Sequence, residues 1–265
     1  MATVLPPTLS VPSLQIPKGL LTMVVGRVGS GKSTLLAALL NEAPLVHGSI
    51  QVIGSTSYCA QQAWLTHGTV RSNILFNKPM DWSKYIDVIK GCALSRDICS
   101  FDNKDFQVVG ERGITLSGGQ KARLALARTV YADKDIVLMD DVLSAVDAHV
   151  GTHLMNNVVL GNGGDKALLA GKTRVLVTHQ TQWLPYADFV VAVSDGKVVG
   201  AGTYAELARQ GLVDTAGEVE NEQKLQDDDE PDVEAVLDRD REDANEDDED
   251  EREEGRLSPK LWKIY

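Results

Sequence analysis

The chain has 265 residues, of which 43% are hydrophobic, so it is long enough to bury a substantial core. Its 23 Gly and 3 Cys exclude collagen-like and disulfide-scaffold classes, and its aliphatic content excludes a wholly disordered chain. The 38 acidic side chains outnumber the 26 basic ones, and the formal net charge of −12 argues against nucleic-acid binding only if the charge is evenly spread.

Residues 1–17 contain four prolines and lack the charged and apolar regions of a secretory signal, so we expect a truncated or disordered N-terminal segment. Beyond it, four short apolar runs are typical of buried parallel strands: Leu21–Val25, Asp135–Met139, Arg174–Thr178 and Phe189–Val193. None approaches the roughly 18 to 20 apolar residues needed to span a bilayer.

Between these strands the pattern is helical, for example over Trp82–Cys92 and Leu116–Val130. Strands and helices that alternate around an internal helical block indicate an α/β fold with a mostly parallel sheet. We therefore expect one domain over residues 18–213, with an inserted α-helical subdomain at about residues 69–131.

The run directly after the first strand has the spacing G-x4-G-K-[ST] and leads into a helical segment. It comprises Gly26, Arg27, Val28, Gly29, Ser30, Gly31, Lys32, Ser33 and Thr34. Glycines let backbone N–H groups wrap around phosphate oxygens, because no Cβ stands in the way. Lys32 is expected to reach the β and γ phosphates, and the Ser33 hydroxyl to coordinate Mg²⁺. The sequence therefore predicts a P-loop nucleoside-triphosphatase core.

Two carboxylates, Asp140 and Asp141, end the strand predicted at 135–139. Open α/β sheets place ligands at the carboxyl ends of their parallel strands. We expect Asp140 to hold Mg²⁺ through its water shell and Asp141 to face the attacking water. Alone, such a pair is usually only a strand end, but behind a complete P-loop it indicates hydrolysis.

A second glycine-containing segment, Ser117, Gly118, Gly119 and Gln120, opens the predicted helix at 116–130. Two glycines and a serine at a helix start form another anion-binding terminus. One domain with one triphosphate needs only one such terminus, so we expect this segment to bind the phosphate held by a partner domain. With Leu116 it resembles the signature of ATP-binding-cassette (ABC) nucleotide-binding domains.

Other residues support this resemblance over about residues 13–211. Gln61 resembles the Q-loop glutamine that touches Mg²⁺, Ser144–Asp147 resembles the D-loop, and His179 resembles the switch histidine that senses the γ-phosphate. Taken alone, Gln61 could equally be an ordinary loop residue, and His179 could equally be a capping or core histidine. Their common order along the chain favours the ABC interpretation.

Val109–Gly113 resembles the X-loop of ABC exporters, and the stretches around Gln61, Ser144 and His179 resemble the first cassette of subfamily C, the multidrug-resistance-associated branch. The resemblance implies ATP and Mg²⁺ as ligands. It also implies a second nucleotide-binding domain and transmembrane domains as partners, and no nucleic acid. The cassette of such an exporter lies on the cytoplasmic side of a membrane and reaches that membrane only through transmembrane segments that this chain lacks.

The net negative charge of the chain comes from its C-terminal tail. Glu218–Glu254 holds 21 acidic and 4 basic residues, a net charge of −17, so the rest of the chain carries +5. With no aromatic residue, the tail cannot bury enough surface to offset its ordering entropy. We expect a disordered acidic linker at 214–256. Residues 257–265 are expected to begin a following transmembrane domain, which would make the chain a fragment.

Two departures from the family pattern affect the expected chemistry. Asp141 stands where hydrolysis-competent cassettes carry Glu, and the missing methylene withdraws its carboxylate by about 1 to 1.5 Å from the attacking water. No Trp, Tyr or Phe precedes Tyr58, so the usual adenine platform is absent. We expect weak hydrolysis, and ATP binding weakened by about 1 to 3 kcal/mol.

Two alternatives remain. A soluble, non-transport ABC protein acting on ribosomes or DNA is disfavoured, because such proteins carry two cassettes and no X-loop. The second alternative is a regulatory nucleotide-sensing module, as in the channel-type relatives. It remains open because an Asp in place of the catalytic Glu suits a nucleotide sensor as well as a slow ATPase.

Overall fold

The computed structural model describes residues 8–110, 116–160, 167–213 and 231–237. Six strands form one sheet in the order β2-β5-β6-β1-β7-β8. They are β1 Leu21–Val25, β2 Thr56–Cys59, β5 Ile136–Asp140, β6 Thr173–Val177, β7 Phe189–Ser194 and β8 Lys197–Gly202. All neighbouring pairs are parallel except β7 and β8, which are antiparallel. The predicted α/β fold with a mostly parallel sheet is confirmed.

The four predicted apolar runs located β1, β5, β6 and β7 to within one residue, whereas β2 and β8 were not predicted. β1 matches its prediction, whereas β5 begins and ends one residue later than predicted and β6 one residue earlier. Hydropathy marks the buried stretch, but the hydrogen-bond ladder to neighbouring strands decides where a strand ends.

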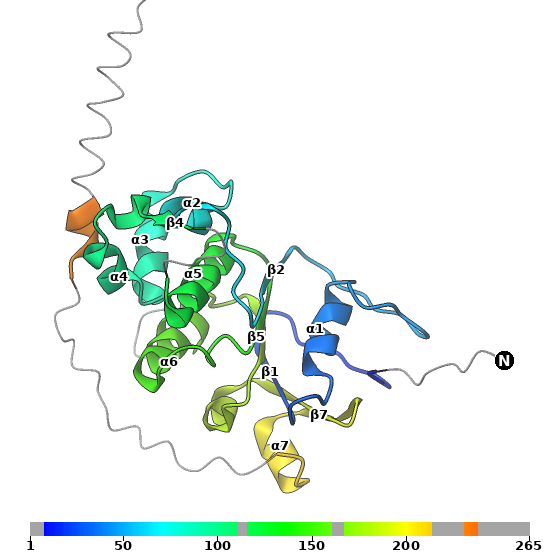
Figure 1. The fold of residues 1–265 in the computed structure, drawn as a ribbon. Helices are drawn as coiled ribbons and strands as arrows, with labels where there is room; N and C mark the ends of the chain where they lie inside the picture. Colours follow the sequence, from blue (N-terminus) through cyan, green and yellow to red (C-terminus); the bar gives the residue numbers. More distant parts are fainter. Residues whose placement is uncertain (1–7, 111–115, 161–166, 214–230, 238–265) are drawn as a thin grey trace, which may run out of the picture.

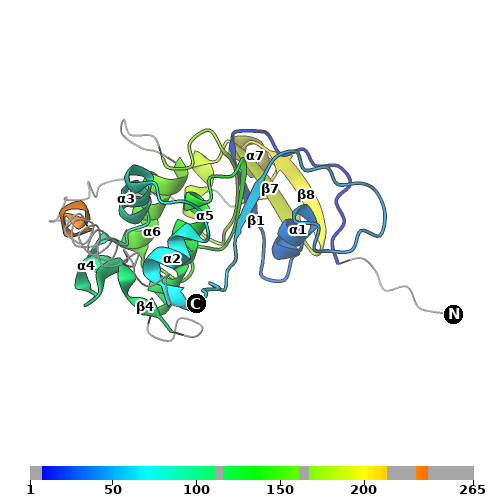
Figure 2. The same ribbon diagram turned by 90° about the horizontal axis from the view of Figure 1, so that it is seen from above.

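The sheet is buried on both faces because successive side chains of a strand point in opposite directions. In β1, Val24 joins an apolar cluster with Leu35 and Leu36 of α1 (Lys32–Leu39), whereas Met23 and Val25 join a larger cluster on the other face. Figures 1 and 2 show α1 on one side of the sheet and the remaining large helices on the other.

The insertion predicted at about 69–131 contains most of the helices. They are α2 Val70–Leu75, α3 Trp82–Gly91, α4 Ser95–Ser100, the 3₁₀ turn η1 Lys104–Phe106 and α5 Gly118–Tyr131. A short antiparallel pair, β3 Gly68–Thr69 and β4 Val108–Val109, forms a separate sheet in this region. α5 begins two residues later than predicted because the Ser117 side chain caps it, and α3 begins where Asp81 caps it.

A buried carboxylate ties these helices together. Asp105 accepts hydrogen bonds from Arg71 Nε at 2.7 Å and from the Tyr85 hydroxyl at 2.8 Å. The Arg71 guanidinium also lies over the rings of Trp82 and Phe106. Burial raises the pKa of Tyr85 well above its usual value, and the charge of Asp105 adds to the effect. A single charged residue therefore joins α2, α3 and η1.

The remaining elements follow the sheet. They are α6 Ala148–Leu154, the π-helix η3 Met155–Leu160, the 3₁₀ helix η4 Thr181–Tyr186 and α7 Tyr204–Arg209. Before β1, residues 8–20 contain no strand and make one bridge, between Ser10 and Lys197. None of the helices in the described ranges has the length and apolar character needed to cross a bilayer.

One part of the tail departs from the prediction. Within the linker expected at 214–256, residues 233–237 are helical, and Val233 and Leu237 are buried. Composition does not reveal that the folded domain offers an apolar surface for these two side chains, so the sequence did not predict this helical turn. The rest of the tail, including 257–265, lies outside the described residues, as do residues 1–7.

Candidate functional site

Apart from Ser117–Gln120, the predicted site residues lie at the carboxyl ends of four parallel strands, which meet at one edge of the sheet. Val24 of β1 and Asp140 of β5 are both paired with Val177 of β6, so these strands end at one level. The P-loop follows β1, Gln61 follows β2, Asp141 follows β5 and His179 follows β6. The fold therefore gathers residues that are separated by up to about 150 positions in the sequence.

Glycines shape the P-loop for a steric reason. A Cβ on Gly26 would lie 2.0 Å from the Val193 carbonyl oxygen, so this position has no room for a side chain. Gly31 has φ +107° and caps α1 in a left-handed conformation. Gly29 has φ +79°, and a Cβ there would meet nothing within 4 Å. The loop is packed tightly against β7 and open on its outer side.

Lys32 lies folded over its own loop. Its Nζ donates to the carbonyl oxygens of Gly26, at 2.8 Å, and Arg27, at 2.9 Å. Burial lowers the pKa of Lys32, and the negative charges of Asp141 and Asp140 act in the opposite direction. Among the described residues no carboxylate lies within ion-pair distance of its ammonium group. A buried cation bonded to neutral carbonyls fits an anionic ligand.

Other atoms of the loop have the same character. The buried hydroxyl of Ser30 has no hydrogen-bond partner among the described residues, whereas Ser33 at the start of α1 is exposed. The Ser30 carbonyl accepts a hydrogen bond from the backbone N–H of Gly196 at 3.0 Å, so the P-loop is bonded to the turn between β7 and β8. These features fit a phosphate group resting on the loop.

Asp140 and Asp141 are nearly buried, with 5% and 8% of their surface exposed. Gln61 Nε2 donates to Asp141 Oδ2 at 3.2 Å, which brings together two residues 80 positions apart. Asp141 has φ +49°, and its carbonyl accepts from the Ser144 hydroxyl at 2.7 Å and from the Ser144 N–H at 3.1 Å. Non-glycine residues in this strained region cluster at functional sites. This turn therefore holds the Asp141 carboxylate in hydrogen-bonding contact with Gln61.

His179 lies in the bend after β6 and is exposed, next to the buried Thr178. The backbone N–H of Gln180 donates to the Thr178 hydroxyl at 3.0 Å, which shapes this bend. The structure therefore brings His179 to the same sheet edge as Asp141.

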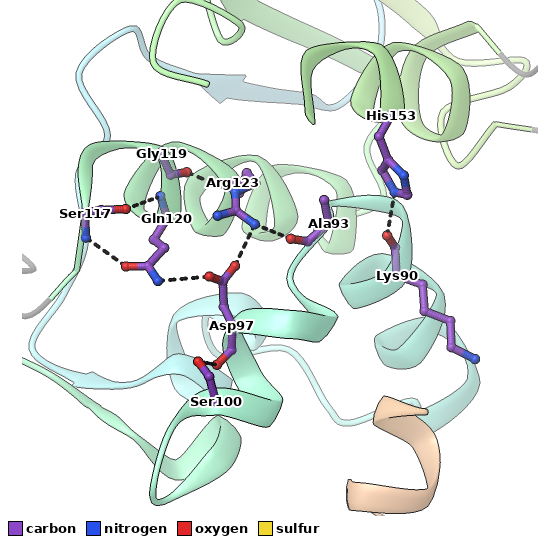
Figure 3. A network of polar contacts seen from close by, with 9 residues as sticks. All are labelled: Lys90, Ala93, Asp97, Ser100, Ser117, Gly119, Gln120, Arg123 and His153. Atoms are coloured by element: carbon purple, nitrogen blue, oxygen red, sulfur yellow. Dashed lines mark hydrogen bonds and ion pairs between the residues drawn. The ribbon is translucent and has the colours of Figure 1, made fainter. Parts of the chain in front are cut away.

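The segment Ser117–Gln120 begins α5 with a complete capping box. The Ser117 hydroxyl accepts from the Gln120 N–H at 3.2 Å, and Gln120 Oε1 accepts from the Ser117 N–H at 2.8 Å. Ser117 and Gly118 are exposed. The polar contacts of this segment that Figure 3 draws lie within the helical subdomain rather than at the P-loop.

Asp97 of α4 anchors this segment and was not among the predicted site residues. Its carboxylate accepts from Gln120 Nε2 at 2.9 Å and from Arg123 at 2.6 Å (Figure 3). Arg123 also donates to the carbonyl oxygens of Ala93 and Gly119. Arg123 lies about one turn after Gln120, so the helical period places both on one face, but no local pattern identifies Asp97.

The Ser144–Asp147 segment packs against the same helix start. A Cβ on Gly119 would lie 3.2 Å from the Ala145 carbonyl oxygen, so glycine permits this close approach. Asp147 caps α6 by accepting from the Val150 N–H at 2.9 Å. The predicted signature and D-loop are therefore neighbours in space.

A protein-family model described as ABC transporter matches residues 9–144. The chain belongs to the ABC transporter family. It is 47% identical over 203 residues to ATP-binding cassette sub-family C member 3 of Rattus norvegicus. It is 48% identical over 217 residues to the probable multidrug resistance-associated protein lethal(2)03659 of Drosophila melanogaster, and 46% identical over 205 residues to ABC transporter C family member 7 of Arabidopsis thaliana.

The aligned parts cover 77% to 82% of this chain but only 13% to 15% of these relatives. The chain is thus an ABC transporter ATP-binding cassette related to subfamily C, and it matches a small part of each full-length relative. Of the predicted X-loop, Val109 is buried in β4 and Gly110 follows it, whereas residues 111–113 lie outside the described residues.

Proposed function

We propose that this cassette binds MgATP on the loop that follows β1. The supporting observation is that the P-loop, Gln61, Asp140 and Asp141 converge at one sheet edge around an ammonium group that, among the described residues, has no carboxylate within ion-pair distance. The N-terminal turn of α1, where Ser33 is exposed, carries the partial positive charge that favours phosphate. In this proposal the triphosphate rests on residues 26–34.

The proposed magnesium ligands are Ser33 and Asp140, with Gln61 beside them. Mg²⁺ typically takes one or two protein oxygens and completes its shell with phosphates and water. An exposed hydroxyl and a nearly buried carboxylate at one sheet edge suit such a site. The ion would neutralise phosphate charge when bound.

We further propose that intrinsic hydrolysis is slow. A general base must lie within about 2.6 to 3.2 Å of the water whose proton it takes. Asp141 is shorter than the usual Glu, and its Oδ2 already accepts a hydrogen bond from Gln61. His179, exposed on the neighbouring loop, is the proposed sensor of the γ-phosphate.

In this proposal a second cassette completes the site. Ser117 and Gly118 are exposed at the start of α5, where backbone N–H groups and the helix dipole are available to an anion. The two cassettes would pair head to tail, so that each signature faces the other cassette's ATP.

The proposed role is to power export through transmembrane domains that lie outside this chain. Trp64 and Phe76 are 63% and 44% exposed, and the Arg128 guanidinium lies over both rings. Aromatic and arginine side chains are enriched at protein interfaces. This patch, close to Gln61 in the sequence, is the proposed contact with those domains, through which the cassette would associate with the membrane.

The first test measures binding of a fluorescent ATP analogue with Mg²⁺ to the purified chain. Lys32→Ala should weaken binding at least about tenfold, which corresponds to 1.4 kcal/mol. Lys78→Ala, which removes an exposed lysine of the helical subdomain, is the matched control and should leave affinity unchanged. Equal affinity in the two variants would overturn the proposed site.

A second test measures phosphate release by the purified chain. The wild type should hydrolyse ATP slowly, and Asp141→Asn should change that slow rate little. Asp102→Asn, an exposed aspartate, is the control. Vigorous turnover that Asp141→Asn abolishes would refute slow hydrolysis. Tight binding with no turnover would favour the nucleotide-sensing function instead, which the shortened carboxylate also suits.

A further inference from the structure

Residues 231–237 of the acidic tail carry their own folding signals. Asp232 caps the turn, because its Oδ1 accepts from the Ala235 N–H at 3.1 Å and its carbonyl accepts from the Val236 N–H at 3.2 Å. Pro231 precedes the cap, and Glu234 places a negative charge in the first turn. One helical turn therefore forms inside a segment whose composition suggests a solvated chain.

The turn has one buried face. Val233 and Leu237 are spaced i, i+4 and each is 0% exposed, whereas Glu234 and Ala235 are exposed. Both buried side chains belong to the large apolar cluster that fills the helical side of the sheet. Full burial of a Val or Leu side chain is a favourable contribution that a solvated spacer does not make.

Two charged groups of this turn lie near residues of α3 and α4. Glu234 Oε2 is 3.2 Å from Lys90 Nζ of α3. Burial raises the pKa of Cys99 in α4; the positive charge of Lys104 acts against this, and the negative charge of Asp232 adds to it. Figures 1 and 2 show the turn, in orange, beside α3 and α4 and well away from α7, after which the tail begins.

We infer that the face of the helical subdomain formed by α3 and α4 is a docking site whose occupant is the chain's own segment 231–237. Apolar burial of Val233 and Leu237 holds the segment, and the Glu234–Lys90 pair orients it. Both members of that pair are about half exposed, so the pair adds little affinity. The acidic tail is thereby tethered to the helical subdomain.

The docked segment lies near the residues that position the start of α5. α4 carries both Cys99, whose pKa the charge of Asp232 raises, and Asp97, which holds Gln120 and Arg123 at the start of α5. Figure 3 shows the docked turn and this network in the same subdomain. The docked turn therefore attaches the tail next to the helix that positions the signature.

Hydrogen–deuterium exchange on the full chain tests the docking without any nucleotide. Amides of residues 233–237 should exchange at least about tenfold more slowly than an unstructured peptide of the same sequence. Val233→Ser with Leu237→Ser should abolish that protection and accelerate exchange in Trp82–Gly91 and Ser95–Ser100, while β1 stays unchanged. Ala235→Ser, on the exposed face of the same turn, is the matched control and should preserve protection.

The charge pair and the source of the segment are tested in the same samples. Lys90→Glu should accelerate exchange at 233–237, and adding Glu234→Lys should restore it, because the swap recreates the pair. Unprotected amides at 233–237 in the wild type, or a double serine variant that leaves α3 and α4 unchanged, would overturn the inference. So would protection that appears only when light scattering reports a dimer, because the segment would then come from a second copy.

Discussion

Replacing Asp97 by alanine removes the carboxylate that joins α4 to the first turn of α5. Two hydrogen bonds are lost, one from Gln120 at 2.9 Å and one from Arg123 at 2.6 Å. Hydrogen bonds to charged groups contribute about 1.5 to 3 kcal/mol each. The side chains of Asp97 and Arg123 are only 15% and 14% exposed, so solvent screens them weakly.

Arg123 keeps the carbonyl oxygens of Ala93 and Gly119 as partners, so its charge does not lose every acceptor. We therefore expect Asp97→Ala to lower the free energy of unfolding by about 2 to 4 kcal/mol, below the upper value for breaking a fully buried ion pair. A domain of ordinary stability, about 5 to 15 kcal/mol, remains folded after such a loss.

Urea unfolding followed by circular dichroism measures this change, with Asp102→Ala as the exposed control expected within about 0.5 kcal/mol of the wild type. A double-mutant cycle with Gln120→Ala separates the contact to the signature from the contact to Arg123. A loss below about 0.5 kcal/mol for Asp97→Ala, or a cycle with no coupling between Asp97 and Gln120, would refute the assignment of Asp97 as the anchor.

The packing of the domain makes three further outcomes testable. Gly26→Ala should destabilise the fold by about 1 to 3 kcal/mol and abolish nucleotide binding, because its Cβ would stand 2.0 Å from the Val193 carbonyl; calorimetry that finds normal binding would contradict this. Asp105→Asn should lower stability by about 3 to 5 kcal/mol in urea, since Arg71 loses its buried counter-charge, and a change under about 1 kcal/mol would be inconsistent with that role. Burial raises the pKa of Cys59 from 9.0 to about 11. As the pH rises, the Cys59 thiol of the unfolded chain therefore deprotonates before the same thiol of the folded chain does. Stability should fall by roughly 1 kcal/mol per unit between about pH 9 and 11, less steeply in Cys59→Ala.

Most of the candidate site could be predicted from the sequence because its parts are short and local. The spacing from Gly26 to Thr34 already specifies a loop of backbone donors before a helix, and a strand that ends in Asp140 and Asp141 carries them to the sheet edge. The segment Ser117–Gln120 was likewise expected to open a helix, and α5 begins at Gly118 with Ser117 as its N-cap.

Asp97 and the docked turn were not predictable in this way. Asp97 is one of many acidic residues, and only the approach of α4 to α5 selects it as the partner of Gln120. Val233 and Leu237 lie in a strongly acidic stretch without aromatic residues, so composition suggested disorder. Their burial depends on a surface built by helices about 140 positions earlier in the chain.

The sequence by itself determined that the tail is strongly acidic and that the folded part carries a loop with the G-x4-G-K-[ST] spacing, because composition and a contiguous motif need no tertiary context. The tertiary structure alone decided which residues share a contact: Gln61 with Asp141, Asp97 with the start of α5, and Glu234 with Lys90. Contacts between distant residues depend on how elements pack, and no local pattern encodes that packing.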